Sequence, residues 1–242
     1  MNKTLCFDFG NTRLKCGVFD DGKIIDVITL EDDSEKVISD LLKAHMPVNT
    51  LLSSVINHNP AVEIILEKET RFHLLDHTSK IPITTPVGKP ETIGADRLAM
   101  VVAVAAEYSE RNNLVIALGT AITYNFINKK KEFLGGGISP GLDMRFRSLH
   151  SYTAKLPLIE KDWNFPLIGY DTRTNILSGV IYGMMKEIDG TIDLYNEKYS
   201  NLNVVLTGGD SAYFARHLKN RIFADQNLIF KGLYALSELN NV

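Results

Sequence analysis

The sequence of residues 4–30 reads TLCFDFGNTRLKCGVFDDGKIIDVITL. It contains three runs, residues 4–9, 14–19 and 24–30, in which apolar and polar residues alternate in the manner of half-buried β-strands. The runs are separated by Gly10-Asn11 and Asp21-Gly22, which are typical turn dipeptides. This stretch predicts an antiparallel meander of three strands.

The same pattern returns in the second half of the chain. Residues 114–118 and 122–127 predict strands around the turn Gly119-Thr120, and the charged turn 129–131 leads to a short strand at 132–134. A repeated strand, glycine turn and strand indicates a duplicated α/β domain. We expect the boundary near residue 112, with domains at residues 1–112 and 113–242.

The segments after each meander add helices and further strands. In the first half, Ser34 caps a predicted helix that ends at Pro47, and then come a strand near 51–55, a helix after Pro60 and a strand at 72–75. The remaining predicted elements are an apolar helix at 98–108, a helix after Pro140-Gly141, a long helix at about 172–199, a strand at 204–206 and a helix after Gly208-Gly209. Between them, residues 76–93 hold three prolines and predict a long loop.

The composition argues against several classes of protein. The formal net charge is −3, so nucleic acid is a poor candidate partner. The longest apolar run, residues 98–106, is too short to cross a membrane, and the N-terminal residues lack the pattern of a secretory signal. We therefore expect a cytoplasmic protein. Cys6 and Cys16 form no CxxC pair, which favours buried thiols over a disulfide, and the scattered histidines do not indicate a metal site.

The first glycine turn has the residue types of a phosphate site. In Asp8-Phe9-Gly10-Asn11-Thr12, backbone NH groups and the Thr12 hydroxyl can face phosphate oxygens. Asp8 ends an otherwise apolar strand, where a carboxylate is costly unless it meets water or a cation, so it is a candidate magnesium anchor. Lys15 is near enough to reach the same phosphates. The alternative is an ordinary hairpin whose turn is held by Asp8.

Two further turns could complete a nucleotide site. Gly119-Thr120-Ala121-Ile122-Thr123 repeats the first turn, so the two halves could hold a polyphosphate from both sides. Thr207-Gly208-Gly209-Asp210 follows a strand and offers a helix N-terminus for a nucleoside. Taken alone, this glycine pair is a weak signal.

A carboxylate and a guanidinium stand side by side in Gly94-Ala95-Asp96-Arg97, at the start of the apolar helix. Phosphoryl transfer needs a group that accepts the hydroxyl proton and a cation that stabilises the developing charge. The alternative is a carboxylate stabilised by the helix dipole, with Arg97 in a surface ion pair.

Two common nucleotide motifs are absent from the sequence. No GxxxxGKS segment occurs, and residues 135–141, GGGISPG, do not fit GxGxxG because Pro140 occupies the last glycine position. We therefore expect neither a P-loop enzyme nor a dinucleotide-binding one.

Taken together, DFGNTRLK (8–15), PETIGADR (90–97), LGTAITY (118–124), GGGISPG (135–141) and TGGD (207–210) resemble type III pantothenate kinases along nearly the whole chain. The resemblance implies an actin-like fold of the acetate and sugar kinase, heat-shock chaperone and actin superfamily, with duplicated ribonuclease-H-like domains. It also implies a homodimer whose partner completes the substrate site. The implied reaction phosphorylates pantothenate with ATP in the first step of coenzyme A biosynthesis.

The resemblance also assigns roles to residues. Asp96 would be the general base, and Asp8 would hold Mg²⁺. The residues implied to bind ATP are Asp8, Phe9, Gly10, Asn11, Thr12, Arg13, Leu14, Lys15 and Thr120. Those implied to contact pantothenate are Gly94, Ala95, Asp96, Arg97 and Thr172.

Three positions depart from the family pattern. Ala117 replaces an aspartate that holds an activating K⁺ or NH₄⁺ ion, so the monovalent-cation site is in question. Asn125 replaces an acidic residue, and Val87 replaces a tyrosine that contacts substrate. Two alternatives stay open: an ATP-binding regulatory or accessory protein on the same fold, and a kinase of another small metabolite.

Overall fold

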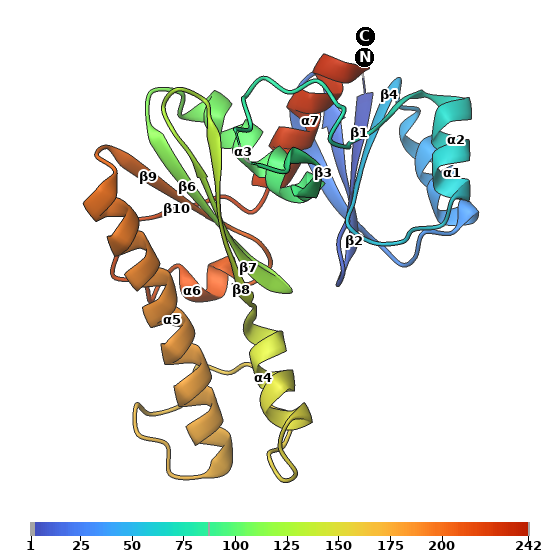
Figure 1. The fold of residues 1–242 in the computed structure, drawn as a ribbon. Helices are drawn as coiled ribbons and strands as arrows, with labels where there is room; N and C mark the ends of the chain where they lie inside the picture. The colour runs from blue at the N-terminus through green and yellow to red at the C-terminus, as the bar shows by residue number, and fades with distance from the viewer. Residues whose placement is uncertain (1–2, 87, 242) are drawn as a thin grey trace. The chain divides into compact units, whose positions relative to one another are not determined.

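The computed structural model describes residues 3–86 and 88–241 and contains two mixed β-sheets (Figure 1). The strand order is β3-β2-β1-β4-β5 in one sheet and β8-β7-β6-β9-β10 in the other. Each sheet starts with a meander in chain order, and its fourth and fifth strands continue the sheet on the other side of the first strand. The two sheets therefore share one topology, as a duplication requires.

The first sheet contains the strands expected from residues 4–30. The strands β1 (Lys3–Phe9), β2 (Leu14–Asp20) and β3 (Lys23–Leu30) pair antiparallel, so the first meander is confirmed. The remaining two, β4 (Asn49–Ser54) and β5 (Arg71–Leu74), run parallel to β1. Cys6 and Cys16 are fully buried free thiols in this sheet, as predicted.

The second sheet consists of β6 (Asn112–Leu118), β7 (Ala121–Ile127), β8 (Phe133–Pro140), β9 (Leu202–Thr207) and β10 (Phe223–Ala224). The expected end of the third strand at residue 134 is wrong, because β8 continues through three glycines. Gly136 explains this, since a side chain there would collide with the carbonyl oxygen of Tyr124 on β7. The glycines allow close strand pairing rather than ending the strand.

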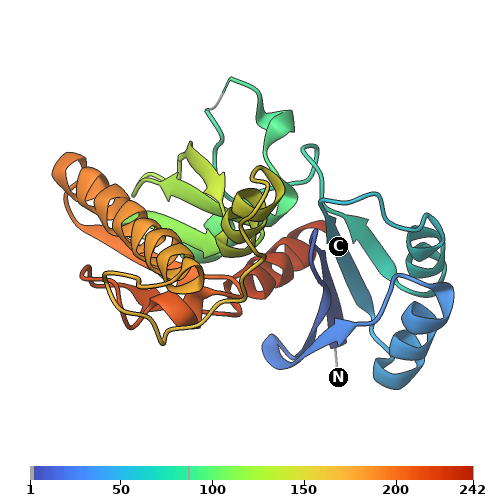
Figure 2. The same ribbon diagram turned by 90° about the horizontal axis from the view of Figure 1, so that it is seen from below.

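Helices cover both faces of the first sheet (Figures 1 and 2). On one face, α1 (Glu35–His45) and α2 (Ala61–Glu69) pack on a core that includes Phe7 and Phe9. Ser34 caps α1 as predicted, because its Oγ accepts a hydrogen bond from the backbone NH of Val37. On the other face are α3 (Ala95–Glu107), which follows the short η1 (Pro90–Thr92), and α7 (Leu228–Asn240).

In the second sheet, the long helix α5 (Thr172–Lys198) contributes Leu177, Ile181 and Met184 to the core formed with β6, β7 and β9. The helix α4 (Leu142–Ser151) and the N-terminal half of α5 extend beyond the end of the sheet (Figure 1). A short helix, α6 (Ser211–Phe214), follows β9.

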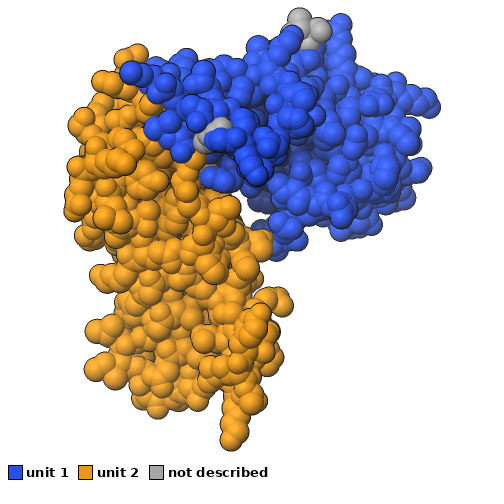
Figure 3. Space-filling model, viewed as in Figure 1, with its two compact units in different colours: residues 1–109, 130–134, 227–242 blue, residues 110–129, 135–226 orange. Residues whose placement is uncertain are grey.

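The chain forms two compact units, residues 1–109, 130–134 and 227–242, and residues 110–129 and 135–226 (Figure 3). The bounds of these units differ from a single division of the chain at residue 112. One reason is that the C-terminal helix α7 packs in the first unit, and the sequence analysis did not predict this helix. Gly232 of α7 lies so close to the backbone of Ala99 on α3 that no side chain would fit. The division into domains 1–112 and 113–242 stays a prediction. In the described chain, every helix is too short or too polar to span a membrane.

Candidate active site

Asp8 lies at the carboxyl end of β1, the central strand of the first sheet. Directly opposite it are Lys15 on β2 and Ser53 on β4, so the three side chains belong to the same face of the sheet. Asp8 is half-buried, and Ser53 is fully buried. This row of three polar residues, Asp8, Lys15 and Ser53, ends an otherwise apolar part of the sheet.

The Asp8 carboxylate lies in an unfavourable environment for a negative charge. The pKa of Asp8 is raised to about 7. Burial is the largest cause, the nearby charge of Asp96 also raises the pKa, and the Lys15 ammonium lowers it. A cation bound at Asp8 would stabilise the ionised form. These properties fit a magnesium anchor.

The turn after β1 projects from this end of the sheet. Gly10 donates its backbone NH to the carbonyl oxygen of Arg13 over 3.1 Å, which closes the turn. Asn11, Thr12 and Arg13 are exposed. Backbone NH groups in such a turn can bind phosphate oxygens.

Asp96 lies in the first turn of α3, two residues after the N-terminal cap Gly94. Burial raises its pKa, whereas the backbone NH of Arg97 and the Arg97 guanidinium lower it. A side chain at Gly94 would place its Cβ only 2.5 Å from Oδ1 of Asp96. The missing side chain of Gly94 is therefore what leaves room for the Asp96 carboxylate.

Arg97 is half-buried and lies over the ring of Phe133, with 5.8 Å between the guanidinium carbon and the ring centroid. Burial lowers its pKa and the Asp96 carboxylate raises it. An aromatic contact of this kind holds the guanidinium in one orientation. The pair is thus less exposed than the surface ion pair considered as the alternative.

The three glycine motifs of the second unit meet at the carboxyl end of β6. Gly119 donates its NH to the Ala121 carbonyl and closes the tight turn, and Gly141 donates to the carbonyl of Thr120, both over 3.1 Å. The backbone NH of Asp210 donates to the Leu118 carbonyl over 3.1 Å. The turn at Thr120 is therefore held by backbone contacts from both GGGISPG and TGGD.

The two described positions that depart from the family pattern have different consequences. Ala117 lies opposite Thr123 on β7 and Thr207 on β9, so neither strand neighbour provides a carboxylate there. Asn125 is buried and donates its amide to Thr123 Oγ1 over 3.0 Å and to the Val115 carbonyl over 3.4 Å. A carboxylate could not donate these hydrogen bonds. Val87 lies outside the described residues.

Thr172 is the first residue of α5 and is exposed. The preceding Asp171 caps the helix in a reciprocal arrangement with Thr174. Thr172 belongs to the lining of a largely apolar cavity of about 580 Å³, whose other lining residues are Leu149, Leu156, Asn175, Ile176, Gly179 and Val180.

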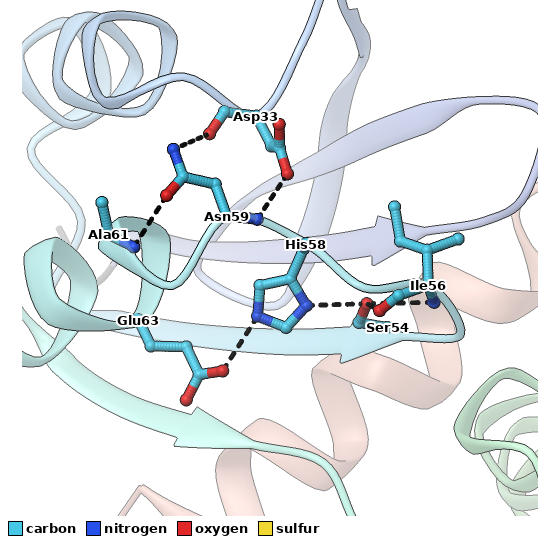
Figure 4. A network of polar contacts seen from close by, with 7 residues as sticks. All are labelled: Asp33, Ser54, Ile56, His58, Asn59, Ala61 and Glu63. Atoms are coloured by element: carbon cyan, nitrogen blue, oxygen red, sulfur yellow. Dashed lines mark hydrogen bonds and ion pairs between the residues drawn. The ribbon is translucent and has the colours of Figure 1, made fainter.

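The sequence analysis missed a polar network next to the Asp8 turn (Figure 4). His58 places Nδ1 2.9 Å from Ser54 Oγ and Nε2 2.9 Å from Glu63 Oε1. The ring of His58 also contacts Phe9, and the backbone NH of Val55 donates to the Phe9 carbonyl over 3.0 Å. The network fixes the loop after β4 beside β1, and its only sequence signal was a histidine near a strand end.

A second missed feature is the segment before α5. Lys161 forms an ion pair with Asp210, and Trp163 stacks on Tyr213 with ring centroids 3.5 Å apart. This segment therefore lies against α6 and the TGGD turn. The one tryptophan of the sequence was its only signal.

No cluster of three or more His, Cys, Asp or Glu side chains that could hold a metal occurs in the described parts of the chain. A single carboxylate can hold Mg²⁺ together with phosphate oxygens of a bound ligand, which is how this ion is commonly held. The predicted residues Asp8, Lys15, Asp96 and Arg97 lie in the first unit, and Thr120 and Thr172 in the second.

The sequence of the chain is similar to that of known proteins of one family. Residues 4–194 match the family model described as Type III pantothenate kinase. A Type III pantothenate kinase of Flavobacterium johnsoniae is 38% identical over 231 residues, which cover 95% of each chain.

Solved structures resemble the chain in fold. A conserved Baf family protein of Campylobacter jejuni, described as a transcriptional activator, has a TM-score of 0.60 at 21% identity and covers 97% of each chain. The ROK hexokinase of Thermus thermophilus has a TM-score of 0.51 at 12% identity, covering 98% of this chain and 99% of its own. The predicted actin-like fold of duplicated ribonuclease-H-like domains is confirmed.

Proposed function

The chain belongs to the type III pantothenate kinase family, and from this premise we propose how its residues carry out the reaction. It is a pantothenate kinase, an enzyme of coenzyme A biosynthesis that phosphorylates pantothenate with ATP. The sequence matches along most of the chain favour this reaction over a regulatory protein and over a kinase for another metabolite.

Asp96 is the general base. It accepts the proton of the pantothenate hydroxyl as the oxygen of that hydroxyl attacks the terminal phosphorus of ATP. The bond from this phosphorus to the oxygen that bridges to the next phosphate breaks, and ADP leaves. The observation that carries this role is the half-buried carboxylate at the start of α3, whose pKa is raised by burial. A raised pKa strengthens a carboxylate as a base, while the Arg97 NH and guanidinium favour its ionised form.

The Asp8 turn binds the phosphates of ATP. The ATP-binding residues in this proposal are Asp8, Phe9, Gly10, Asn11, Thr12, Arg13, Leu14 and Lys15, together with Thr120 of the second unit. Asp8 holds Mg²⁺, which when bound neutralises charge on the transferred phosphate. Lys15 adds a positive charge next to Asp8.

Pantothenate is bound by Gly94, Ala95, Asp96, Arg97 and Thr172. Its carboxylate is a suitable partner for a guanidinium. The apolar side chains of Tyr152, Ile168 and Tyr170 near Thr172 are at least 80% exposed, which supports a homodimer at this end of the second unit. The enzyme acts in the cytoplasm, and light scattering of the purified protein tests the dimer.

The experiment is a kinase assay on purified protein with ATP, Mg²⁺ and pantothenate. Wild type forms phosphopantothenate, and Asp96→Asn lowers kcat by about 10²- to 10⁴-fold because the proton acceptor is lost. Affinity for a non-hydrolysable ATP analogue, measured by calorimetry, stays close to that of wild type.

The matched control is Asp143→Asn. Asp143 is also the second residue of its helix, α4, but it is exposed and lies outside the motif of residues 135–141. A helix-dipole role for Asp96 predicts equal, small effects of both substitutions. Full turnover of Asp96→Asn would show that Asp96 is not the base.

A further inference from the structure

Ser53 carries a buried hydroxyl that has no explanation in the protein alone. The residue is fully buried on β4, and its Oγ has no hydrogen-bond partner among the described residues. A buried hydroxyl without a partner costs about 1–3 kcal/mol. Such a group is expected to gain a partner in another state of the protein.

The position of Ser53 indicates that partner. In the parallel pairing of β1 and β4, Ser53 lies directly opposite Asp8, and both residues face the side of the sheet that carries Lys15. Ser53 is thus the strand neighbour of the proposed magnesium anchor. A hydroxyl can donate a hydrogen bond to a carboxylate oxygen.

Carboxylates that bind metal ions are usually held by hydrogen bonds from neighbouring groups, which fix their orientation. We propose that Ser53 is a positioning residue of the Asp8 site, whose hydroxyl donates a hydrogen bond to the Asp8 carboxylate when Asp8 holds the cation that accompanies ATP. This inference rests on the proposed role of Asp8. It adds a residue that lies outside the five motifs at residues 8–15, 90–97, 118–124, 135–141 and 207–210.

The second sheet offers an internal comparison. Thr207 on β9 occupies the place of Ser53, because it lies opposite Ala117 as Ser53 lies opposite Asp8. A hydroxyl therefore occurs at this place in both sheets, but only the first has a carboxylate beside it. Only the first can form the proposed contact.

The test measures Mg²⁺-dependent binding rather than turnover alone. A non-hydrolysable ATP analogue is titrated by calorimetry into the full chain at a series of Mg²⁺ concentrations without pantothenate. For Ser53→Ala, the Mg²⁺ concentration at half-maximal binding rises about tenfold or more. The KM for pantothenate stays unchanged, and Ser53→Thr, which keeps a hydroxyl, restores the Mg²⁺ dependence.

The matched control is Thr4→Val. Thr4 is another fully buried residue whose Oγ1 has no partner in the described chain, and it lies on the same face of β1 as Asp8, opposite Asn49. Its removal perturbs the same strand pair without touching Asp8. Thr4→Val is therefore expected to keep the Mg²⁺ dependence of wild type.

Several outcomes would overturn the inference. A Ser53→Ala protein with the Mg²⁺ dependence of wild type would do so, and so would an equal loss in Thr4→Val. If Ser53→Ala does not fold, Ser53→Cys, with a similar size and a weaker donor, takes its place. Asp8→Asn separates the two hypotheses. If Asp8→Asn keeps the Mg²⁺ dependence of wild type, the proposed role of Asp8 is wrong. If Asp8→Asn loses this dependence and Ser53→Ala keeps it, only the role of Ser53 is wrong.

Discussion

The two glycine turns of the chain have the same place in the fold and different side chains around them. Each joins the central strand of a sheet to its antiparallel neighbour. Two residues before the first glycine is Asp8, opposite Lys15, and two residues before the second is Ala117, opposite Thr123. The topology places both turns alike, and in the proposed site only the side chain of Asp8 provides a carboxylate for a cation.

The helices that follow the fifth strand of each sheet, α3 and α7, also differ in whether they carry a charged residue at their second position. The second residue of α3 is Asp96, whereas the second residue of α7 is Ile229. Charged residues suited to phosphoryl transfer are thus gathered in the first half of the duplication. The second half offers backbone NH groups and hydroxyls.

The largest expected effect comes from moving the carboxylate between the turns. Asp8→Ala is expected to lower kcat/KM for ATP by about 10²-fold or more, because the charge that anchors the cation is lost. The double variant Asp8→Ala, Ala117→Asp keeps the total charge and moves the carboxylate to the second turn. We expect no rescue in a steady-state assay, and recovery of activity would show that the turns are interchangeable.

The stability of the ligand-free protein should depend on Asp8 and on pH. The pKa of Asp8 in the folded state, about 7, lies above the ordinary value of 3.8. As pH rises, the Asp8 carboxyl therefore loses its proton in the unfolded chain before it does so in the folded chain. The free energy of unfolding falls as pH rises from 3.8 through 7. Asp8→Asn removes this loss and should be more stable than wild type by on the order of 2 kcal/mol at about pH 8.

Urea unfolding at about pH 8 and about pH 3 measures this difference, which should nearly vanish at the lower pH because Asp8 is then largely protonated in both states. The same destabilisation of wild type at both pH values would contradict the environment described for Asp8.

A smaller effect is expected from Gly94→Ala. Gly94 has φ −59°, which suits alanine, but the new Cβ would displace the Asp96 carboxylate. We expect kcat to fall about tenfold through misplacement of the base, with an unchanged melting temperature. Gly190→Ala in α5 is the control, since its Cβ would meet no atom within 4 Å. Equal activities of the two variants would remove Gly94 from the positioning of Asp96.

The smallest effect concerns monovalent ions. With Ala117 beside the second turn, replacing K⁺ and NH₄⁺ by a bulky organic cation should leave the rate unchanged within error. Ala117→Asp provides the missing carboxylate and should make the rate respond to K⁺. A strong K⁺ requirement of wild type would mean that other groups hold the ion.

Local sequence signals predicted much of the fold. Alternation and turn dipeptides gave both meanders, and Ser34 marked the start of α1. The extension of β8 and the helix α7 were missed because they depend on distant contacts, between Gly136 and Tyr124 and between Gly232 and Ala99. Local propensity does not contain such contacts.

The same division applies to the candidate site. Asp8, Asp96 and the glycine turns stand in recognisable motifs, so their place in the sequence was informative. Ser53 lies beside Asp8 through strand register, and His58 belongs to a loop network. An isolated serine or histidine in the sequence does not show either placement.

The helix α7 also has a consequence for how the protein is made. In the chain, α7 comes after residues 135–226 of the second unit. In the structure it packs on the first sheet: Phe230 fills the space beside Gly17, and Tyr234 stacks on Phe19. A ribosome that has synthesised only the first half therefore presents a sheet with one apolar face that only α3 covers in part. Maturation of this unit waits until the later unit has been translated, which exposes the nascent chain to chaperones during that interval.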